Sequence, residues 1–383
     1  MTMPQVTLEQ LKTIGPALLA EVVRQDQCSP DFAVTSWSVE RLSDKGIANP
    51  DGLFRFHGRG CLGGMERSWS VVLKILREFP DDIPLTSMEY GRRELSLASS
   101  GLLANLPGPV VVPRVYRACE QDGRGWIWME HVQSASSQRW IAHDYAKTAR
   151  LLGRWQGAYL CGVPLPEAPW LCRDLHRSWL AAYQVGAESG WRNPLFRRHL
   201  SAAAQSRYLA LRDDAARFCS ALEALPRVLS HGDLGRRNLF IREWPDGRSE
   251  LVVIDWEECG PGPLGADLGE LVGLSALHLE YEPMDTPRVA AAAIEGYGAG
   301  LRDASWTGNA DLARLGYVAG ISIHLGASFP ALVPWFIVKE GQAFALQQFD
   351  LAGEELLQKW IPLFLYVLDC ADEARKLMAQ LNL

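Results

Sequence analysis

The stretch from residue 228 to 269, VLSHGDLGRRNLFIREWPDGRSELVVIDWEECGPGPLGADLG, constrains the fold and the chemistry of this chain more than any other. It places His231, Asp233 and Asn238 in the spacing H-x-D-x4-N, and a later apolar run leads directly to Asp255. Phosphoryl transfer requires groups of this kind, because its loose transition state leaves the protein mainly with positioning and charge neutralisation. We assign Asp233 as the base that orients the attacking hydroxyl, and Asn238 and Asp255 as oxygen ligands for Mg²⁺.

A predicted β-hairpin explains how the two metal ligands meet. The β-prone segments 239–243 and 250–254 flank residues 244–249, which contain the Asp-Gly pair typical of a tight turn. A hairpin brings its open ends together, so we expect Asn238 and Asp255 to lie side by side. The alternative is that these polar residues only shape turns and cap a helix.

The same residues carry a resemblance to a known family. HGDLGRRN at 231–238, IDWE at 254–257 and the later Ala-Asp-Leu at 266–268 resemble the motifs of the aminoglycoside phosphotransferase and choline kinase superfamily, relatives of the eukaryotic protein kinases. The resemblance implies an α+β, bilobal, protein-kinase-like fold with a small antiparallel-sheet N-lobe and a larger, mainly helical C-lobe. It further implies that His231 orders the catalytic loop and that Asp267 braces it.

Length and charge agree with a two-lobed soluble protein. The chain has 383 residues, more than one hydrophobic core usually supports, and we expect an N-lobe over 1–131 and a C-lobe over 132–383. Hydrophobic residues make up 48% and charged residues 22% of the chain, which is ordinary for a globular protein. The net charge of -7 argues against a general nucleic-acid binder, which would need Lys and Arg at the phosphates.

The cysteines and the apolar segments predict a cytoplasmic protein without a membrane span. Eight cysteines are scattered without a C-x2-C pair, which favours reduced thiols over disulfides or zinc. The N-terminal residues lack the apolar core of a signal peptide. Residues 317–338 carry no Asp, Glu, Lys or Arg, but they contain His324, Pro330 and Pro334, so we expect two buried helical pieces with a break.

The first third of the chain predicts the small lobe. A helix over 7–25 is expected to split near Gly15-Pro16, and strands are expected at 35–43, 53–60, 69–76, 113–118 and 126–129. Lys74 lies inside an apolar strand. By resemblance it reaches the α and β phosphates of the nucleotide, although such a lysine taken alone is usually a surface residue. Its expected carboxylate partner is Glu94, which lies at the head of the apolar face of a predicted helix over 85–103. Glu89 on the same helix is the alternative.

Two further nucleotide contacts follow from the resemblance. Glu130 and Val132 mark the interlobe hinge, whose backbone groups bind adenine in such folds. The expected phosphate loop is weak: the connection 44–52 holds only Gly46 and Gly52 and lacks the G-x-G-x-x-G pattern of protein kinases.

The C-terminal two thirds is predicted to be helical around the catalytic hairpin. Arg236 and Arg237 lie in the catalytic loop, where they can stabilise the transferred phosphoryl group or an acidic acceptor. A group of acids after Asp255 can bind substrate amines or form a solvated face: Glu257, Glu258, Glu270, Glu280 and Glu282. Helices are expected at 140–160, near 171–186 and 194–223, and at about 267–280, 286–303, 309–329, 335–348 and 353–381.

The function that the sequence predicts is phosphorylation of a hydroxyl, with ATP (GTP is not excluded) and Mg²⁺ as cofactors. Asp233, His231 and Arg236 form the predicted catalytic set. The acceptor is expected to be a small molecule such as an aminoglycoside, an aminoalcohol or a sugar. One alternative is Ser or Thr in a biosynthetic precursor peptide, and a second is a pseudokinase that only binds partners.

Overall fold

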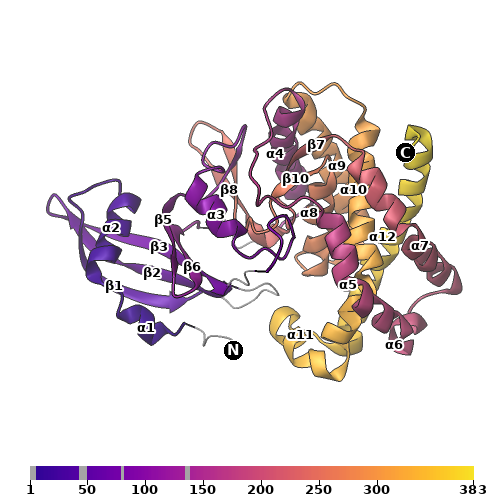
Figure 1. Ribbon diagram of the computed structural model, residues 1–383, viewed down its shortest axis with the longest axis horizontal. Coiled ribbons are helices and arrows are strands. Elements are labelled where there is room, and N and C mark those ends of the chain that lie inside the picture. Colours follow the sequence, from indigo (N-terminus) through magenta and orange to yellow (C-terminus); the bar gives the residue numbers. More distant parts are fainter. Residues whose placement is uncertain (1–5, 43–49, 79–81, 134–138) are drawn as a thin grey trace.

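The computed structural model describes residues 6–42, 50–78, 82–133 and 139–383. Its N-terminal part is built on a five-stranded antiparallel sheet in the order β1-β2-β3-β6-β5, on the left of Figure 1. The predicted strands are confirmed, and most extend beyond their predicted limits because long paired runs satisfy the backbone hydrogen bonds. Their bounds are β1 (Ala33–Arg41), β2 (Pro50–Leu62), β3 (Met65–Glu78), β5 (Val115–Gln121) and β6 (Arg124–Glu130).

Helices cover both faces of this sheet. On one face lie α1 (Leu8–Lys12) and α2 (Pro16–Asp26), separated at Gly15-Pro16 as the sequence predicts. The other face packs against α3 (Arg93–Ser100). This helix is shorter than the predicted 85–103, because the segment before it makes turns and Gly101 ends it in the left-handed conformation with φ 68°.

The alternation of β3 decides which face Lys74 occupies. Val71, Leu73 and Ile75 are fully buried in the cluster shared with α1 and α2. Neighbouring strand residues point to opposite faces, so Lys74 projects toward α3 instead. The period-2 pattern of a single strand therefore directs the lysine into the space between the sheet and the rest of the chain.

The remaining chain forms a larger, mainly helical body with its own core, on the right of Figure 1. Three helices, and not two, occupy the segments expected near 171–186 and 194–223, because Asn193 and Ser201 each cap the start of a further helix. The helix bounds are α4 (Ala142–Leu160), α5 (Leu175–Arg192), α6 (Pro194–Arg198), α7 (Ala202–Glu223), α8 (Ala266–Leu277), α9 (Thr286–Asp303), α10 (Ala310–Ile321), α11 (Gln342–Phe349) and α12 (Gly353–Leu381).

The uncharged segment 317–338 is folded as a broken helix, as expected. After α10 it continues as a π-helical turn, Ser322–Ala327, a 3₁₀ turn, Phe329–Ala331, and a second π-helical turn, Val333–Ile337. Within the ranges that the structure describes, no helix has the length and apolar character needed to cross a membrane.

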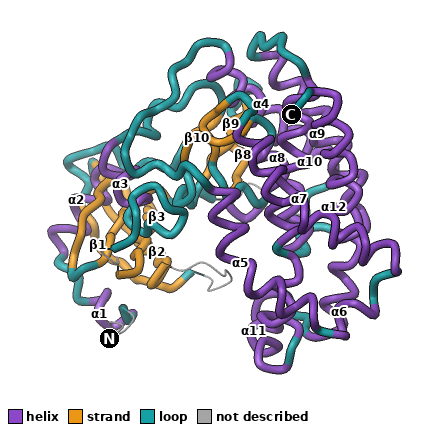
Figure 2. The backbone as a smooth tube through the Cα atoms, turned by 45° about the vertical axis from the view of Figure 1, so that its right-hand side comes forward, coloured by secondary structure: helices purple, strands orange, loops and turns teal. Residues whose placement is uncertain are grey.

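Two small sheets lie between the large sheet and the helices (Figure 2). One has the order β4-β9-β8, in which β8 (Leu239–Glu243) and β9 (Ser249–Val253) are the predicted hairpin and β4 (Val110–Val111) pairs with β9 in parallel. The other pairs β7 (Arg227–Ser230) with β10 (Gly260–Pro263). Together they hold the loops that carry His231, Asp233, Asn238 and Asp255.

Candidate active site

The catalytic loop connects β7 to β8 and ends in a 3₁₀ turn, Arg236–Asn238. The hairpin register pairs Leu239 with Val253. One step further along, the backbone N–H of Ile254 donates to the carbonyl of Asn238 at 3.0 Å. Asn238 and Asp255 therefore lie at the adjacent open ends of β8 and β9, the arrangement that the turn signal predicts.

Asp233 and Asn238 are in direct contact. The amide Nδ2 of Asn238 donates to the backbone carbonyl of Asp233 at 2.8 Å and to its Oδ2 at 3.0 Å. Arg237 forms an ion pair with the same carboxylate at 3.2 Å. Because Nδ2 is occupied in this way, the Oδ1 of Asn238 is the atom left to bind a cation.

Asp255 sits in the left-handed region with φ 69°. This conformation costs a residue other than glycine roughly 1–2 kcal/mol, and such strain is typical of functional positions. Its Oδ1 accepts a hydrogen bond from the Nζ of Lys74 at 2.6 Å. Burial favours the neutral acid, but the Lys74 ammonium outweighs it and holds the pKa of Asp255 below the ordinary value.

Lys74 joins the sheet to the segment that follows β9. Its Nζ also pairs with Glu94 of α3 at 2.5 Å, while Glu89 is exposed and lies before the helix. Burial disfavours the ammonium, yet Asp255 and Glu94 together raise the pKa of Lys74 above its usual range. Burial next to Asp255 raises the pKa of a third carboxyl, Glu257, to about 7. The structure thus brings Glu94, and not Glu89, to the lysine.

Asp267 organises the catalytic loop through four hydrogen bonds. Its Oδ1 accepts from the hydroxyl of Ser230 at 2.6 Å and the N–H of Gly232 at 3.1 Å. Its Oδ2 accepts from the N–H of His231 at 2.9 Å and from Gln156 at 2.8 Å. Asp267 is only 1% exposed, so these donors compensate the burial of its charge.

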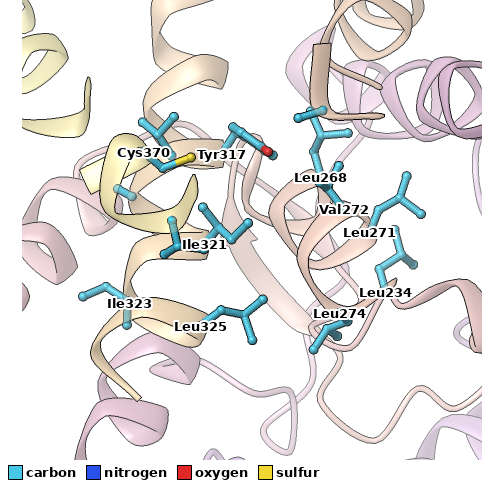
Figure 3. Packing of buried hydrophobic residues seen from close by; sticks show 14 of the residues in the cluster. Leu234, Leu268, Leu271, Val272, Leu274, Tyr317, Ile321, Ile323, Leu325 and Cys370 are labelled. Carbon is cyan, nitrogen blue, oxygen red and sulfur yellow. The ribbon is translucent and has the colours of Figure 1, made fainter. Parts of the chain in front are cut away.

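His231 and Leu234 fix the loop from its other sides. The Nε2 of His231 lies 2.9 Å from the carbonyl of Ile254, which links the loop to the backbone just before Asp255. Leu234 is fully buried, and Figure 3 shows it beside Leu271 and Leu274 of α8. The loop that carries Asp233 is therefore held between a hydrogen-bonded side and an apolar side.

The two loop arginines lie in different places. Arg236 stacks over Trp140 at 4.1 Å and donates to the carbonyl of Leu239, and burial lowers its pKa. Arg237 contacts Asp233. A role for Arg236 at the transferred phosphoryl group stays a prediction, because the recorded contacts of its guanidinium are structural.

A cavity of about 1380 Å³ lies between the sheet and the catalytic hairpin. Lys74, Asn238 and Asp255 line one part of it, and the hinge residues Glu130 and Val132 line another. The carboxylate of Glu130 pairs with Arg242 at 2.6 Å, and binding of adenine by the backbone here stays a prediction. Most of the expected phosphate loop, residues 43–49, lies outside the described residues.

Sequence reasoning missed Arg93, which is 0% exposed. Its guanidinium donates to four backbone carbonyls: Trp170 at 2.7 Å, Glu257 at 2.5 Å, Leu85 at 3.2 Å and Ser87 at 2.5 Å. It thereby ties the start of α3, next to Glu94, to segments of the helical body. Nothing in the sequence distinguishes it from its neighbour Arg92.

The acids that follow Asp255 divide into two groups. Glu282 forms surface ion pairs with Lys359 and Arg139. Glu258 and Glu270 lie near Asp233 instead, and burial raises the pKa of both well above the ordinary value. The Oε2 of Glu258 is buried without a hydrogen-bond partner among the described residues.

The oxygen atoms present fit a hard divalent cation that is shared with a ligand. In the described ranges, no group of three or more His, Cys, Asp or Glu is arranged to hold a metal ion. Mg²⁺ commonly takes one or two protein oxygens and completes its octahedron with phosphates and water. Oδ1 of Asn238 and the carboxylate of Asp255 are oxygen donors of this kind.

Comparisons with solved structures give distant similarities. A microcompartment-associated aminopropanol kinase is 15% identical, with 89% of this chain and 97% of that chain covered and a TM-score of 0.48. Ethanolamine kinase from Plasmodium vivax is 10% identical (87% and 81%, TM-score 0.48). An aminoglycoside phosphotransferase from Streptomyces rimosus, solved with ADP and streptomycin, is 19% identical (82% and 97%, TM-score 0.43).

The sequence itself matches a family model. No curated protein matches the chain. The model described as the phosphotransferase enzyme family, APH, matches residues 71–307, more than half of the 383 residues. The match begins in the strand that carries Lys74 and includes the whole stretch 228–269. This chain belongs to the phosphotransferase enzyme family.

Proposed function

We propose that the protein transfers the terminal phosphoryl group of ATP to a hydroxyl of a small molecule, with Mg²⁺. One observation carries the proposal: Lys74 contacts Asp255, Asn238 contacts Asp233, and the backbone hydrogen bond from Ile254 to Asn238 holds the two pairs at adjacent ends of the hairpin. Lys74, Asn238 and Asp255 line the cavity. A scaffold that only binds partners has no chemical need for all four residues, which argues against the pseudokinase alternative.

Each residue has a defined task in this proposal. Lys74 binds the phosphates, Glu94 orients it, and the hinge at Glu130 and Val132 receives the base of the nucleotide. Asn238 and Asp255 would hold Mg²⁺, which would neutralise part of the charge on the phosphates.

Asp233 orients the acceptor hydroxyl and takes its proton. The oxygen of that hydroxyl forms a bond to the γ-phosphorus as the bond to the β-phosphate oxygen breaks, so ADP leaves with the electron pair. The proton then passes from Asp233 to solvent. Arg237, which contacts Asp233, keeps this carboxylate oriented between turnovers.

The surroundings of Asp233 favour a small acceptor over a peptide. Burial raises the pKa of Tyr183 of α5, and the charges of Glu258 and Asp233 raise it further. Its ring lies 5.9 Å from that of Trp335 in the second π-helical turn. Side chains of the late helices therefore crowd the acceptor side of the base. We place the reaction in the cytoplasm, because all eight cysteines are free thiols.

The test is a mass-spectrometric screen for a phosphoryl mass gain on aminoglycosides, aminoalcohols, sugars and a Ser/Thr peptide, with ATP and GTP compared. Asp233→Asn is expected to lower kcat roughly 10² to 10⁴-fold while Mg²⁺–ATP still raises the melting temperature. Asp255→Asn is expected to abolish that rise. Asp246→Asn, in the exposed hairpin turn, is the matched control. Full turnover by Asp233→Asn with any acceptor contradicts the assignment of the base.

A further inference from the structure

Arg237 brings a second cation to the end of the cavity where the phosphates are expected. It lines the cavity together with Lys74, Asn238 and Asp255. Lys74 pairs with Asp255 at 2.6 Å, and Arg237 pairs with Asp233 at 3.2 Å. Each of these two aspartates therefore has its own cation, and the cation of the base is a guanidinium.

The guanidinium of Arg237 is fixed through two of its nitrogen atoms. Its Nη2 lies 3.5 Å and 3.2 Å from the two carboxylate oxygens of Asp233, and its Nη1 lies 2.7 Å from the Nε2 of His278. A guanidinium can only donate hydrogen bonds, so the Nε2 of His278 carries no proton and accepts. In agreement with this, burial and the charge of Arg237 lower the pKa of His278 to about 3.

His278 is itself held in place by the fold. It directly follows α8, and its ring stacks on Phe349 of α11, with centroids 6.0 Å apart and an interplanar angle of 20°. The same helix holds the catalytic loop through Asp267 and through Ser275, whose hydroxyl accepts from the N–H of Arg236 at 3.2 Å. One helix thus orients both the backbone of the loop and the guanidinium that projects from it.

Part of the donor set of Arg237 is open to a ligand. A guanidinium has five N–H donors, and among the described residues its Nε has no hydrogen-bond partner. The Nε is also absent from the buried polar atoms that lack a partner, so it is accessible to solvent. The side chain as a whole keeps 28% of its surface exposed.

The position of Arg237 next to the base favours the transferred phosphoryl group as that ligand. A hydroxyl held by Asp233 lies about 3–3.5 Å from the phosphorus that it attacks in a reactive arrangement, so the phosphoryl oxygens come close to the guanidinium. In the transition state negative charge spreads over three equatorial oxygens. A planar guanidinium matches the geometry of such oxygens, and a cation fixed in advance stabilises the charge without reorganisation.

We propose that Arg237 is a catalytic residue that donates to an equatorial oxygen of the phosphoryl group during transfer, and that His278 is its positioning residue. The inference rests on the proposed function and assigns to one arginine a role that the sequence leaves open between two. The hydroxyl oxygen forms its bond to phosphorus as the bond to the β-phosphate oxygen breaks, and no proton passes to or from Arg237.

The test compares binding of Mg²⁺–ADP alone with binding of Mg²⁺–ADP plus tetrafluoroaluminate, a planar anion that mimics the transferred group, by isothermal titration calorimetry. We expect tetrafluoroaluminate to tighten binding to the wild-type protein. Arg237→Met is expected to weaken the complex with tetrafluoroaluminate about 10- to 100-fold, the effect of one hydrogen bond between charged groups. Its Kd for Mg²⁺–ADP is expected to stay within about twofold, because ADP lacks the transferred group.

Turnover gives a second measurement. Arg237→Met is expected to lower kcat about 10² to 10³-fold, and Arg237→Lys less, since one ammonium keeps the charge but not the planar set of donors. Arg248→Met is the matched control, because Arg248 pairs with Asp246 in the exposed hairpin turn. It is expected to leave both kcat and the binding of tetrafluoroaluminate unchanged.

Two substitutions of His278 separate positioning from packing. In His278→Gln the side-chain oxygen takes the place of Nε2 and still accepts from Arg237, but the stack on Phe349 is lost. In His278→Phe the stack is kept and the acceptor is lost. A purely structural role makes His278→Phe the milder change. The proposed role makes His278→Gln the milder one in kcat and in the affinity for tetrafluoroaluminate, whichever variant has the higher melting temperature.

The remaining outcomes each decide against a specific step. If Arg237→Met keeps the tightening by tetrafluoroaluminate, or if only the KM for the acceptor rises, Arg237 does not bind the transferred group and the inference is wrong. The same holds if Arg236→Met loses the tightening and Arg237→Met does not. In these cases the proposed function stands, since the wild-type protein still binds Mg²⁺–ADP and transfers phosphate. If the wild-type protein does neither, the proposed function fails and the inference fails with it.

Discussion

Replacing Arg93 by methionine tests whether one buried side chain holds α3 in the position that the site requires. The guanidinium donates to four carbonyls in three chain segments, around Leu85–Ser87, Trp170 and Glu257. Hydrogen bonds to a charged donor contribute about 1.5–3 kcal/mol each. Burial of the charge, which lowers the pKa of Arg93, offsets part of that sum. We therefore expect Arg93→Met to lower the free energy of unfolding by about 3–5 kcal/mol, the range for breaking a buried charged interaction.

The assay is urea unfolding followed by tryptophan fluorescence, with the KM for ATP measured well below the melting temperature. Arg92→Met is the matched control, because the neighbouring Arg92 pairs with Glu120 at the surface and such pairs contribute about 0.2–1 kcal/mol. Arg93→Lys is expected to fall between the two, since a single ammonium cannot span three segments. We also expect Arg93→Met to raise the KM for ATP, because Glu94 follows directly in the chain.

The reasoning is refuted by a small effect. Suppose that Arg93→Met lowers the free energy of unfolding by less than about 1 kcal/mol and leaves its slope with urea concentration unchanged. The four carbonyls then find other donors, and the arginine does not anchor α3. A large loss of stability with an unchanged KM for ATP has a different meaning. The anchor is then real, but Lys74 keeps its partner without it.

Four further substitutions test the rest of the structure. Burial lowers the pKa of His176 to about 3. The free energy of unfolding therefore falls as the pH drops below about 6.5, by about 2 kcal/mol at pH 5. His176→Phe is expected to remove this decrease, measured by urea titrations at pH 7.5 and pH 5. In Asp267→Asn the new side-chain amide faces groups that are themselves hydrogen-bond donors. We expect the free energy of unfolding to fall by about 2–4 kcal/mol in the same assay. Gly190→Ala places a methyl 1.7 Å from the backbone oxygen of Pro330 and should lower the melting temperature, whereas Gly298→Ala in an open helical position should raise it.

Much of the active-site geometry could be predicted because it is local. Asn238 and Asp255 are joined by a tight hairpin, so the Asp-Gly turn and the two β-prone segments decide their proximity without help from the rest of the fold. The period-2 pattern around Lys74 similarly identifies a strand with one polar side chain among apolar ones. The family resemblance carried by the same residues is confirmed by the family match over residues 71–307.

The helical segments could also be predicted, but their ends were less certain. The limits of α9 and α12 agree with the predicted 286–303 and 353–381, since caps and apolar periodicity lie within the segment itself. The predicted start of α3 was wrong by eight residues. Contacts of the Arg93 guanidinium with backbone carbonyls hold the turns before the helix, and no local sequence pattern indicates these contacts.

The sequence by itself determined which side chains are available for the proposed chemistry: Asp233, Asn238 and Asp255 around a hairpin, and Lys74 in a strand. Only the tertiary structure decided which of several equivalent residues takes part. Glu94 instead of Glu89 at Lys74, and the pairing of Arg237 with His278, depend on packing between elements far apart in the chain. The sequence shows which residues are polar. The partner of each polar side chain depends on how helices and sheets pack, and no local sequence pattern predicts that packing.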